Sequence, residues 1–145
     1  MTLVPAPFYD KACAREYLAQ VVDISEDEAV HSVHLSAFDS YFLYAGEEKP
    51  ALLECLQFLL QIKEYNKILC HWDGSVLSLC IAQGKSLQIA NTYQASDFVG
   101  VIYFVILAMK SLQLNPEVST IYFRSPLSSQ RQVMLYHYFM EVKSL

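Results

Sequence analysis

The sequence predicts a mixed α+β (α/β) fold in which three antiparallel strands are followed by a helix, a strand and a helix. Two observations carry this prediction. Alternating apolar runs flank the turns Asp73-Gly74 and Gln83-Gly84, and Asp-Gly between such runs is the strongest short-range hairpin signal. An almost wholly apolar segment, Phe98–Met109, then follows a capping residue, either Ser96 or Asp97, which indicates a buried helix covered on both sides.

Residues 1–66 predict a smaller N-terminal α/β segment, expected to pack with residues 67–145 as one compact unit. Leu3 and Val4 form a short strand that ends at Pro5, because proline cannot donate to a sheet. Asp10 is a typical helix cap. The other elements expected here are a helix at 11–21, strands at 29–35 and 39–45, and a helix at 47–63.

The segment 29–35 has two possible interpretations. Ser25–Glu28 matches a capping box, which would begin a helix, but the alternating β-branched residues that follow favour a strand. On a strand, His31 and His34 are an odd number of residues apart and face opposite sides. The sequence therefore predicts no metal site at these histidines.

Residues 67–145 predict the β-β-β-α-β-α order stated above. Leu77, Leu79 and Ile81 share one face of the middle strand and mark the side of the sheet that faces the core. Ser129–Gln132 has the capping-box pattern that begins a last helix. The expected elements are strands at 67–72, 75–82 and 86–91, a helix at 97–112, a strand at 120–123 and a helix at 129–141.

The composition indicates a globular domain with unusual apolar surface. The chain has 145 residues, enough for one domain with a core. Only 17% of its residues are charged and 54% are hydrophobic, and the mean hydropathy is +0.24, so some apolar surface is expected to meet a partner. The net charge of −5 argues against nucleic-acid binding, which needs clustered lysine and arginine.

Targeting and cysteine patterns point to a cytoplasmic protein. The first residues lack the basic and apolar regions of a signal peptide. The longest apolar run, Phe98–Met109, is too short to span a bilayer, so no membrane insertion is expected. The four cysteines have no CxxC spacing and lie in apolar segments, which predicts reduced core residues without disulfides or zinc.

Five segments occur in an order that resembles a known family. They are Leu3–Asp10 (LVPAPFYD), Gly84–Leu87, Ala90–Tyr93, Ser96–Phe98 and Leu112–Glu117. Together they resemble the patterns LVPxxxF, G-x-x-L-x-x-x-N-x-F and eDFxYYxxxxxxQLxLdPe of a bacterial domain-of-unknown-function family, over residues 2 to about 124. Members of that family have an actin-like ATPase fold.

The resemblance implies that the β-β-β-α-β-α unit is ribonuclease H-like, with residues 1–66 as a connector or a remnant of a first half. Family members are longer and carry a first ribonuclease H-like half before the segment that corresponds to Leu3–Pro5. This chain thus resembles the second half of such a protein. An apolar surface that packs on the first half would be exposed, dimerised or covered by another chain.

Two segments stand where actin-like ATPases bind nucleotide. The resemblance places Asp73-Gly74-Ser75 at the phosphate loop, which is normally D-x-G, and Arg124-Ser125-Pro126 at the adenosine loop, which normally has a glycine pair. This sequence lacks the residue between Asp73 and Gly74, and it lacks the glycines that let a ligand approach the backbone. The resemblance therefore implies the fold without implying nucleotide binding.

The main hypothesis is an uncharacterised, non-catalytic actin-like module that acts by protein–protein interaction or self-association. A protein partner or a homodimer would use the apolar face, and no catalytic residue, metal or cofactor is expected. The alternative is a nucleotide-binding ATPase domain that holds ATP with Mg²⁺, and a third possibility is a truncated product without an independent role. The residues of the nucleotide alternative are Asp73, Gly74, Ser75, Arg124 and Ser125.

Overall fold

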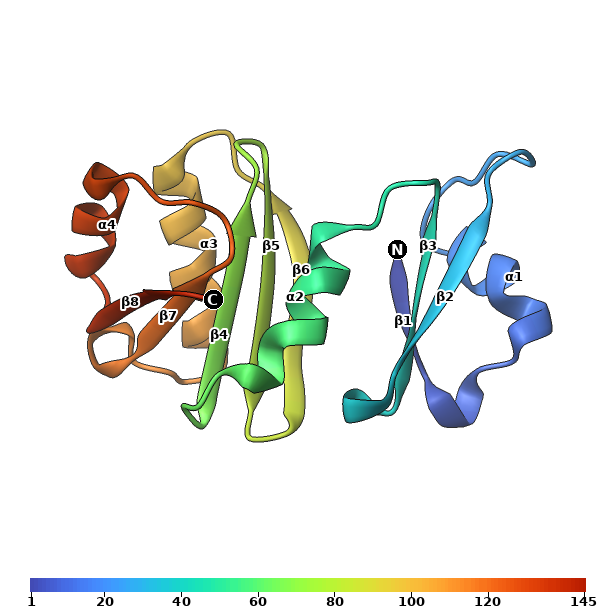
Figure 1. Ribbon diagram of the computed structural model, residues 1–145, viewed down its shortest axis with the longest axis horizontal. Coiled ribbons are helices and arrows are strands. Elements are labelled where there is room, and N and C mark those ends of the chain that lie inside the picture. The colour runs from blue at the N-terminus through green and yellow to red at the C-terminus, as the bar shows by residue number, and fades with distance from the viewer. The chain divides into compact units, whose positions relative to one another are not determined.

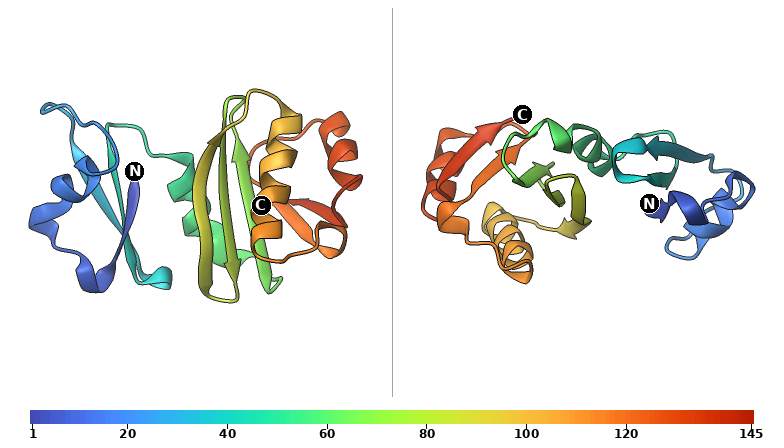
Figure 2. Two further views of the ribbon diagram at one scale, coloured as in Figure 1. Left: turned by 180° about the vertical axis from the view of Figure 1, so that it is seen from behind. Right: turned by 90° about the horizontal axis from the view of Figure 1, so that it is seen from below.

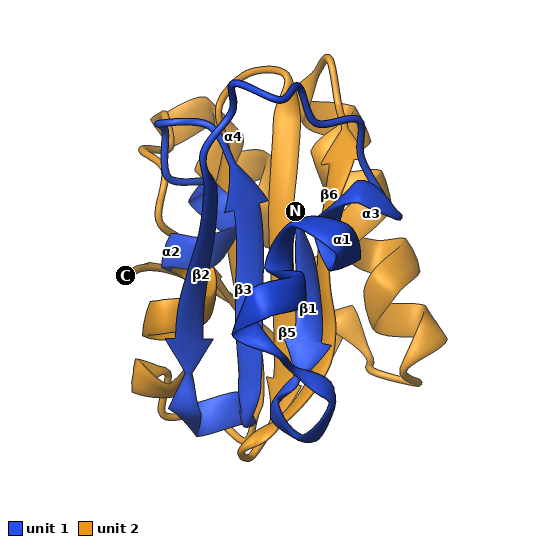
Figure 3. Ribbon diagram, turned by 90° about the vertical axis from the view of Figure 1, so that its right-hand side faces the viewer, with its two compact units in different colours: residues 1–54 blue, residues 55–145 orange.

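The computed structural model describes residues 1–145 (Figure 1), and the chain divides into two compact units, Met1–Glu54 and Cys55–Leu145. Figure 3 colours the two units separately. The sequence analysis placed the division between residues 66 and 67. In the structure, residues 55–66 lie in the second unit, and Cys55, Leu56, Leu59 and Ile62 among them are buried.

The first unit is a three-stranded antiparallel sheet with one short helix. The strand order is β1 (Thr2–Pro5), β3 (Ser40–Ala45), β2 (Val30–Leu35). Strand β2 lies in the segment 29–35, so the strand interpretation of that segment is confirmed. Val4, Leu18 and Leu43 form its small core. Pro5 is the last residue of β1 rather than lying beyond it, at an outer strand where proline is tolerated.

Helix α1 (Ala14–Ala19) is shorter than the expected helix at 11–21. Lys11–Cys13 form a 3₁₀ turn that Asp10 caps through Ala12 N–H. Val21, the last residue of the expected helix, is 56% exposed. Extending the helix to this residue would therefore bury no further apolar surface.

Helix α2 (Ala51–Phe58) and a 3₁₀ turn, Leu59–Gln61, replace the longer helix expected at 47–63. Pro50 explains the late beginning, since the residue before a proline is pushed out of the helical region. Lys67 lies beyond the other end. Its ammonium donates to the carbonyls of Ile62, at 2.8 Å, and Glu64.

The second unit contains a five-stranded mixed sheet with the order β6-β5-β4-β7-β8. Antiparallel β4 (Asn66–Trp72), β5 (Val76–Gln83) and β6 (Ser86–Gln94) form the expected meander. Strand β7 (Thr120–Phe123) runs parallel to β4. Helices α3 (Phe98–Ser111) and α4 (Ser129–Tyr136) pack on one side of this sheet (Figure 2).

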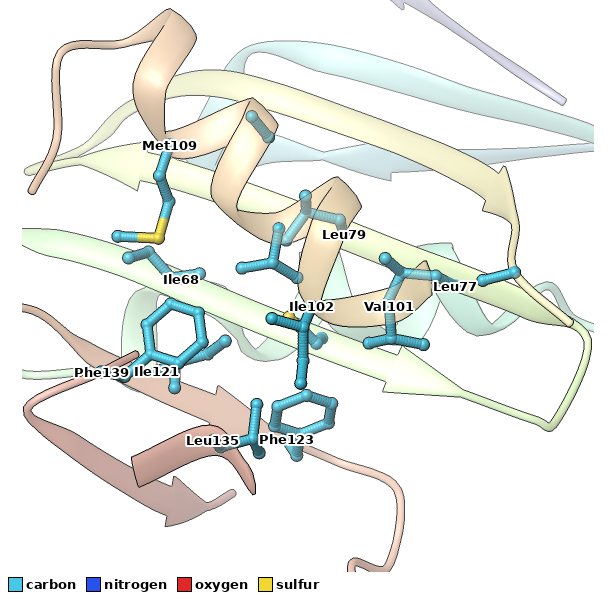
Figure 4. Close-up of a cluster of buried hydrophobic side chains, with 14 of the residues drawn as sticks. Ile68, Leu77, Leu79, Val101, Ile102, Met109, Ile121, Phe123, Leu135 and Phe139 are labelled. Carbon is cyan, nitrogen blue, oxygen red and sulfur yellow. The ribbon is translucent and has the colours of Figure 1, made fainter. Parts of the chain in front are cut away.

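The core of the second unit lies between the sheet and these two helices (Figure 4). Leu77, Leu79 and Ile81 share the face that packs against these helices, as the alternation predicts. Ser78, Cys80 and Ala82 on the opposite face of β5 are buried as well. The expectation that α3 is covered on both sides is wrong, because it has a solvent-facing side. The exposed fractions there are 65% for Val99, 59% for Tyr103 and 51% for Leu107. None of the helices combines the length and apolarity needed to cross a membrane.

The end of the chain corrects the last predicted element. Helix α4 ends at Tyr136 instead of near residue 141, and Glu141–Ser144 form an additional strand, β8, parallel to β7. Met140 N–H donates to Ser119 O, and Leu145 N–H donates to Phe123 O, at 3.1 Å each. This strand depends on pairing with a distant segment rather than on its own sequence pattern.

Candidate functional site at the ends of strands β4 and β7

The two segments that the resemblance assigns to nucleotide binding lie at the carboxyl ends of two neighbouring inner strands of the five-stranded sheet. Strands β4 and β7 are neighbours and parallel, with Cys70 opposite Phe123, so the loops after them begin side by side. Arg124 N–H donates to Cys70 O at 2.9 Å. Ser125 Oγ accepts the N–H of Trp72 at 3.1 Å. The structure thus brings Asp73–Ser75 and Arg124–Ser125 together at the backbone level.

The Asp73 side chain closes its own turn. Its Oδ1 accepts the N–H groups of Ser75, at 2.8 Å, and Val76, at 2.7 Å. The two-residue type I′ turn that Asp-Gly favours in hairpins does not form, because that type requires positive φ at both central residues and Asp73 does not have it. The loop instead contains three residues, with Gly74 at φ +101°.

The charge of Asp73 is stabilised by the same contacts. Hydrogen bonds from the N–H groups of Val76 and Ser75 lower the pKa of its carboxyl, and nearby His71 adds to the effect, against the opposing influence of desolvation. Asp73 is therefore ionised at neutral pH. The negative charge stabilises the turn directly, because two backbone N–H groups donate to one carboxylate oxygen.

The side chains of Arg124 and Ser125 point to different partners. The guanidinium carbon of Arg124 lies 4.1 Å from the centre of the Phe58 ring. The Ser125 hydroxyl bonds to Trp72 N–H, and the residue Ser125 is 8% exposed. Although the backbones of the two loops are close, the side chains of Arg124 and Ser125 therefore do not point toward a common ligand position.

An aromatic cluster beside these loops was not predicted from the sequence. The Trp72 ring centre is 5.6 Å from that of Phe98, and the Arg131 guanidinium lies 4.9 Å from the Trp72 ring centre. Trp72 Nε1–H donates to Ala95 O at 2.9 Å. The capping pattern placed Arg131 near a helix beginning, although the cap is Ser128, one residue earlier than expected. Nothing in the pattern revealed its aromatic neighbours.

A surface hollow of about 360 Å³ lies beside the Asp73 turn. Its lining consists of Gly74, Ser75, Gln94, Ala95 and Ser96. These residues offer backbone groups, hydroxyls and one amide, and none of them carries a positive charge. The hollow can therefore accept a small polar group, but its lining lacks the lysine or arginine that usually holds phosphate.

Comparison with known proteins gives the relationships of the chain. A crystal structure from Bacteroides thetaiotaomicron, described as a protein with an actin-like ATPase fold and unknown function, superposes with a TM-score of 0.73 at 15% identity. The match covers 99% of this chain and 64% of that one. The chain thus spans less than two thirds of the length of that protein. This likeness confirms the expected actin-like fold.

The sequence comparison identifies a family. Among curated proteins there is no match to the chain. Residues 49–142 match the family described as "Protein of unknown function (DUF3822)". This range includes strands β4 to β7, the first two residues of β8 and both helices that pack on the sheet. The expected membership of a domain-of-unknown-function family is confirmed: the chain belongs to DUF3822 and has an actin-like ATPase fold.

Proposed function

We propose that this chain is a non-catalytic module of the actin-like ATPase fold that acts through contacts with another protein or with itself. The observation that carries the proposal is the engagement of the Asp73 carboxylate in its own turn. One oxygen accepts two backbone N–H groups at 2.7 and 2.8 Å. These hydrogen bonds give Asp73 a structural role in the turn that requires no ligand.

The chemistry of Mg-ATP also supports the proposal. Magnesium in nucleotide sites is held by one or two carboxylates together with the substrate phosphates, and the phosphates need positive or backbone donors. Asp73 is the only acidic residue of the β4–β6 meander and its turns. The adjoining hollow contributes no cationic side chain.

The second loop supports the same conclusion. A glycine pair leaves room for adenosine against the backbone, whereas this chain has Arg124, Ser125 and Pro126. Ser125 is almost fully buried and its hydroxyl is bonded to Trp72 N–H. Its side chain therefore fills part of the space that a glycine would leave open.

The solvent-facing side of α3 supports a role in protein contacts. Val99, Tyr103 and Leu107 follow one another at four-residue spacing and are each more than half exposed. Residues four apart lie on one side of a helix, so the three form an apolar stripe. Exposed apolar patches of this kind are typical of interaction surfaces.

Nucleotide binding is the second candidate, and the hollow beside Gly74 and Ser75 favours it. Ligands of open α/β sheets bind beyond the carboxyl ends of strands, which is where this hollow lies. In that case ATP with Mg²⁺ would contact the Asp73–Ser75 turn and the Arg124–Ser125 loop.

Calorimetric titration with Mg-ATP tests the proposal. The wild-type protein should release no binding heat at millimolar nucleotide. Asp73→Asn is the matched variant, because an asparagine oxygen can still accept the two turn N–H groups while the negative charge is removed. Saturable binding in the wild type that Asp73→Asn abolishes would overturn the proposal and establish the nucleotide alternative.

A further inference from the structure

Strand β6 is an outer strand of the five-stranded sheet and lacks the short length, charges and proline that commonly protect such an edge. It is the longest strand, with nine residues, and contains neither a charged residue nor proline. The opposite edge, β8, has only four residues and includes Glu141 and Lys143. Short length and charges are the usual protection against pairing with another strand, so β8 is protected and β6 is not.

The hydrogen bonds identify which groups of β6 point outward. Ala95 N–H donates inward to Ser75 O at 2.8 Å. In an antiparallel pair the bonded residues alternate, so Tyr93 and Asn91 also bond to β5, whereas Ala90, Thr92 and Gln94 present their N–H and C=O groups to the outside. Consistent with this, Thr92 N–H is held by the side-chain oxygen of Asn91 at 2.9 Å instead of by β5.

We propose that β6 is a self-association edge, on which a second copy of this chain pairs antiparallel about a two-fold axis at Thr92. Thr92 would face Thr92 of the other copy, and Ala90 would face Gln94 in both directions. These three bonded pairs would exchange about six backbone hydrogen bonds. The inference rests on the proposed function, since it specifies a partner for a module that acts through protein contacts.

This register avoids the irregular part of the strand. The pairing of β5 with β6 shifts between Ile81 and Ala82, where Ile89 and Leu87 are their partners, so a bulge lies at Gln88. A bulge interrupts the regular alternation of outward groups. Centring the pair on Thr92 uses only Ala90 to Gln94, beyond the bulge.

The charge pattern favours a second copy as the occupant. A two-fold axis places a residue close to its own counterpart, so any charge near the axis would oppose itself. Ser86–Gln94 is uncharged throughout, although the chain has a net charge of −5. Thr92 opposite Thr92 is a favourable cross-strand pair.

The contact is expected to be weak. It involves one strand from each copy, well below the roughly 800 Å² per partner of a standard interface. The Asn91 side chain must also release Thr92 N–H before that group can bond across the axis. We therefore expect a concentration-dependent equilibrium between a 16.5 kDa monomer and a dimer of twice that mass.

Sedimentation equilibrium of the full chain, up to millimolar concentration, tests the inference. Wild-type mass should rise toward twice the monomer value. T92K and T92E should each remain monomeric, because like charges meet at the axis, while an equimolar mixture of the two should dimerise again. T92V, which keeps the N–H and adds no charge, is the matched control and should dimerise like the wild type, and circular dichroism should show that every variant is folded.

A wild-type protein that stays monomeric at all concentrations would overturn the inference, as would dimers that T92K and T92E leave unchanged. Neither result contradicts the proposed function, which Mg-ATP titration tests separately. Conversely, saturable nucleotide binding would remove the proposed function whatever the mass of the protein.

Discussion

The hydroxyl of Ser125 accepts the backbone N–H of Trp72 at 3.1 Å and so joins the end of β7 to the end of β4. Ser125→Ala should leave this partly buried N–H without a partner and lower the free energy of unfolding by about 1–3 kcal/mol. Urea denaturation measures the loss. Ser111→Ala is the control, because that hydroxyl only donates to Ala108 O of its own helix. Equal stability of Ser125→Ala and wild type would contradict this role.

The Asp73 turn should make stability depend on pH. Hydrogen bonds from Val76 and Ser75 lower the folded-state pKa of Asp73 below its ordinary value of 3.8. A depressed folded-state pKa stabilises the protein above the unfolded-state pKa, and this contribution is lost as the pH falls through the folded-state pKa. The stability difference between wild type and Asp73→Asn should therefore be constant near neutrality and shrink below about pH 4. A difference that grows in acid would contradict the assignment.

The Tyr122 hydroxyl donates to Glu64 Oε2 at 2.7 Å, and Lys143 of β8 lies 3.7 Å from Glu64 Oε1. Burial, together with the Glu64 charge, raises the pKa of Tyr122 to about 12. In an alkaline absorbance titration, one of the ten tyrosines should therefore ionise in a separate step near pH 12. Tyr122→Phe should remove this late step and destabilise the fold by about 1–2 kcal/mol. Exposed Tyr103→Phe should retain the late step.

The turn between β5 and β6 should be destabilised by a side chain at Gly84. This glycine has φ +60°, and a Cβ there would lie 3.2 Å from the Tyr65 ring. Gly84→Ala should cost about 1–3 kcal/mol through backbone strain. Gly46→Ala, also at positive φ but in open space, separates strain from crowding. Thermal denaturation should show the larger loss at residue 84, and the reverse order would contradict the contact with Tyr65.

Local patterns predicted those elements whose stability comes from neighbours in sequence. The meander β4–β6 agrees with the predicted strands and turns, and Leu77, Leu79 and Ile81 share the face that packs on the helices, as the alternation predicted. Helix α3 lies where the capping residues and the apolar run predicted it, and Asp97, one of the two possible caps, accepts Gly100 N–H. Turn signals and periodicity suffice when the partners are adjacent strands.

Elements that depend on pairing with distant segments could not be predicted from local patterns. Strand β8 forms because Val142 and its neighbours pair with β7, some twenty residues earlier, and four residues are too few to show a period. The site was also only partly predictable. Asp73 and Ser125 were singled out by resemblance, but their use as turn and strand-end acceptors depends on N–H groups that the fold brings close.

The measurement that tests the central claim most directly uses Trp72, the only tryptophan of the chain. Its indole N–H donates to Ala95 O, and Ala95 lines the hollow beside the Asp73 turn. Its single indole cross-peak in a ¹H–¹⁵N spectrum should remain unchanged as Mg-ATP is added to millimolar concentration. A saturable shift of this peak, absent in Asp73→Asn, would contradict the account of a non-catalytic module.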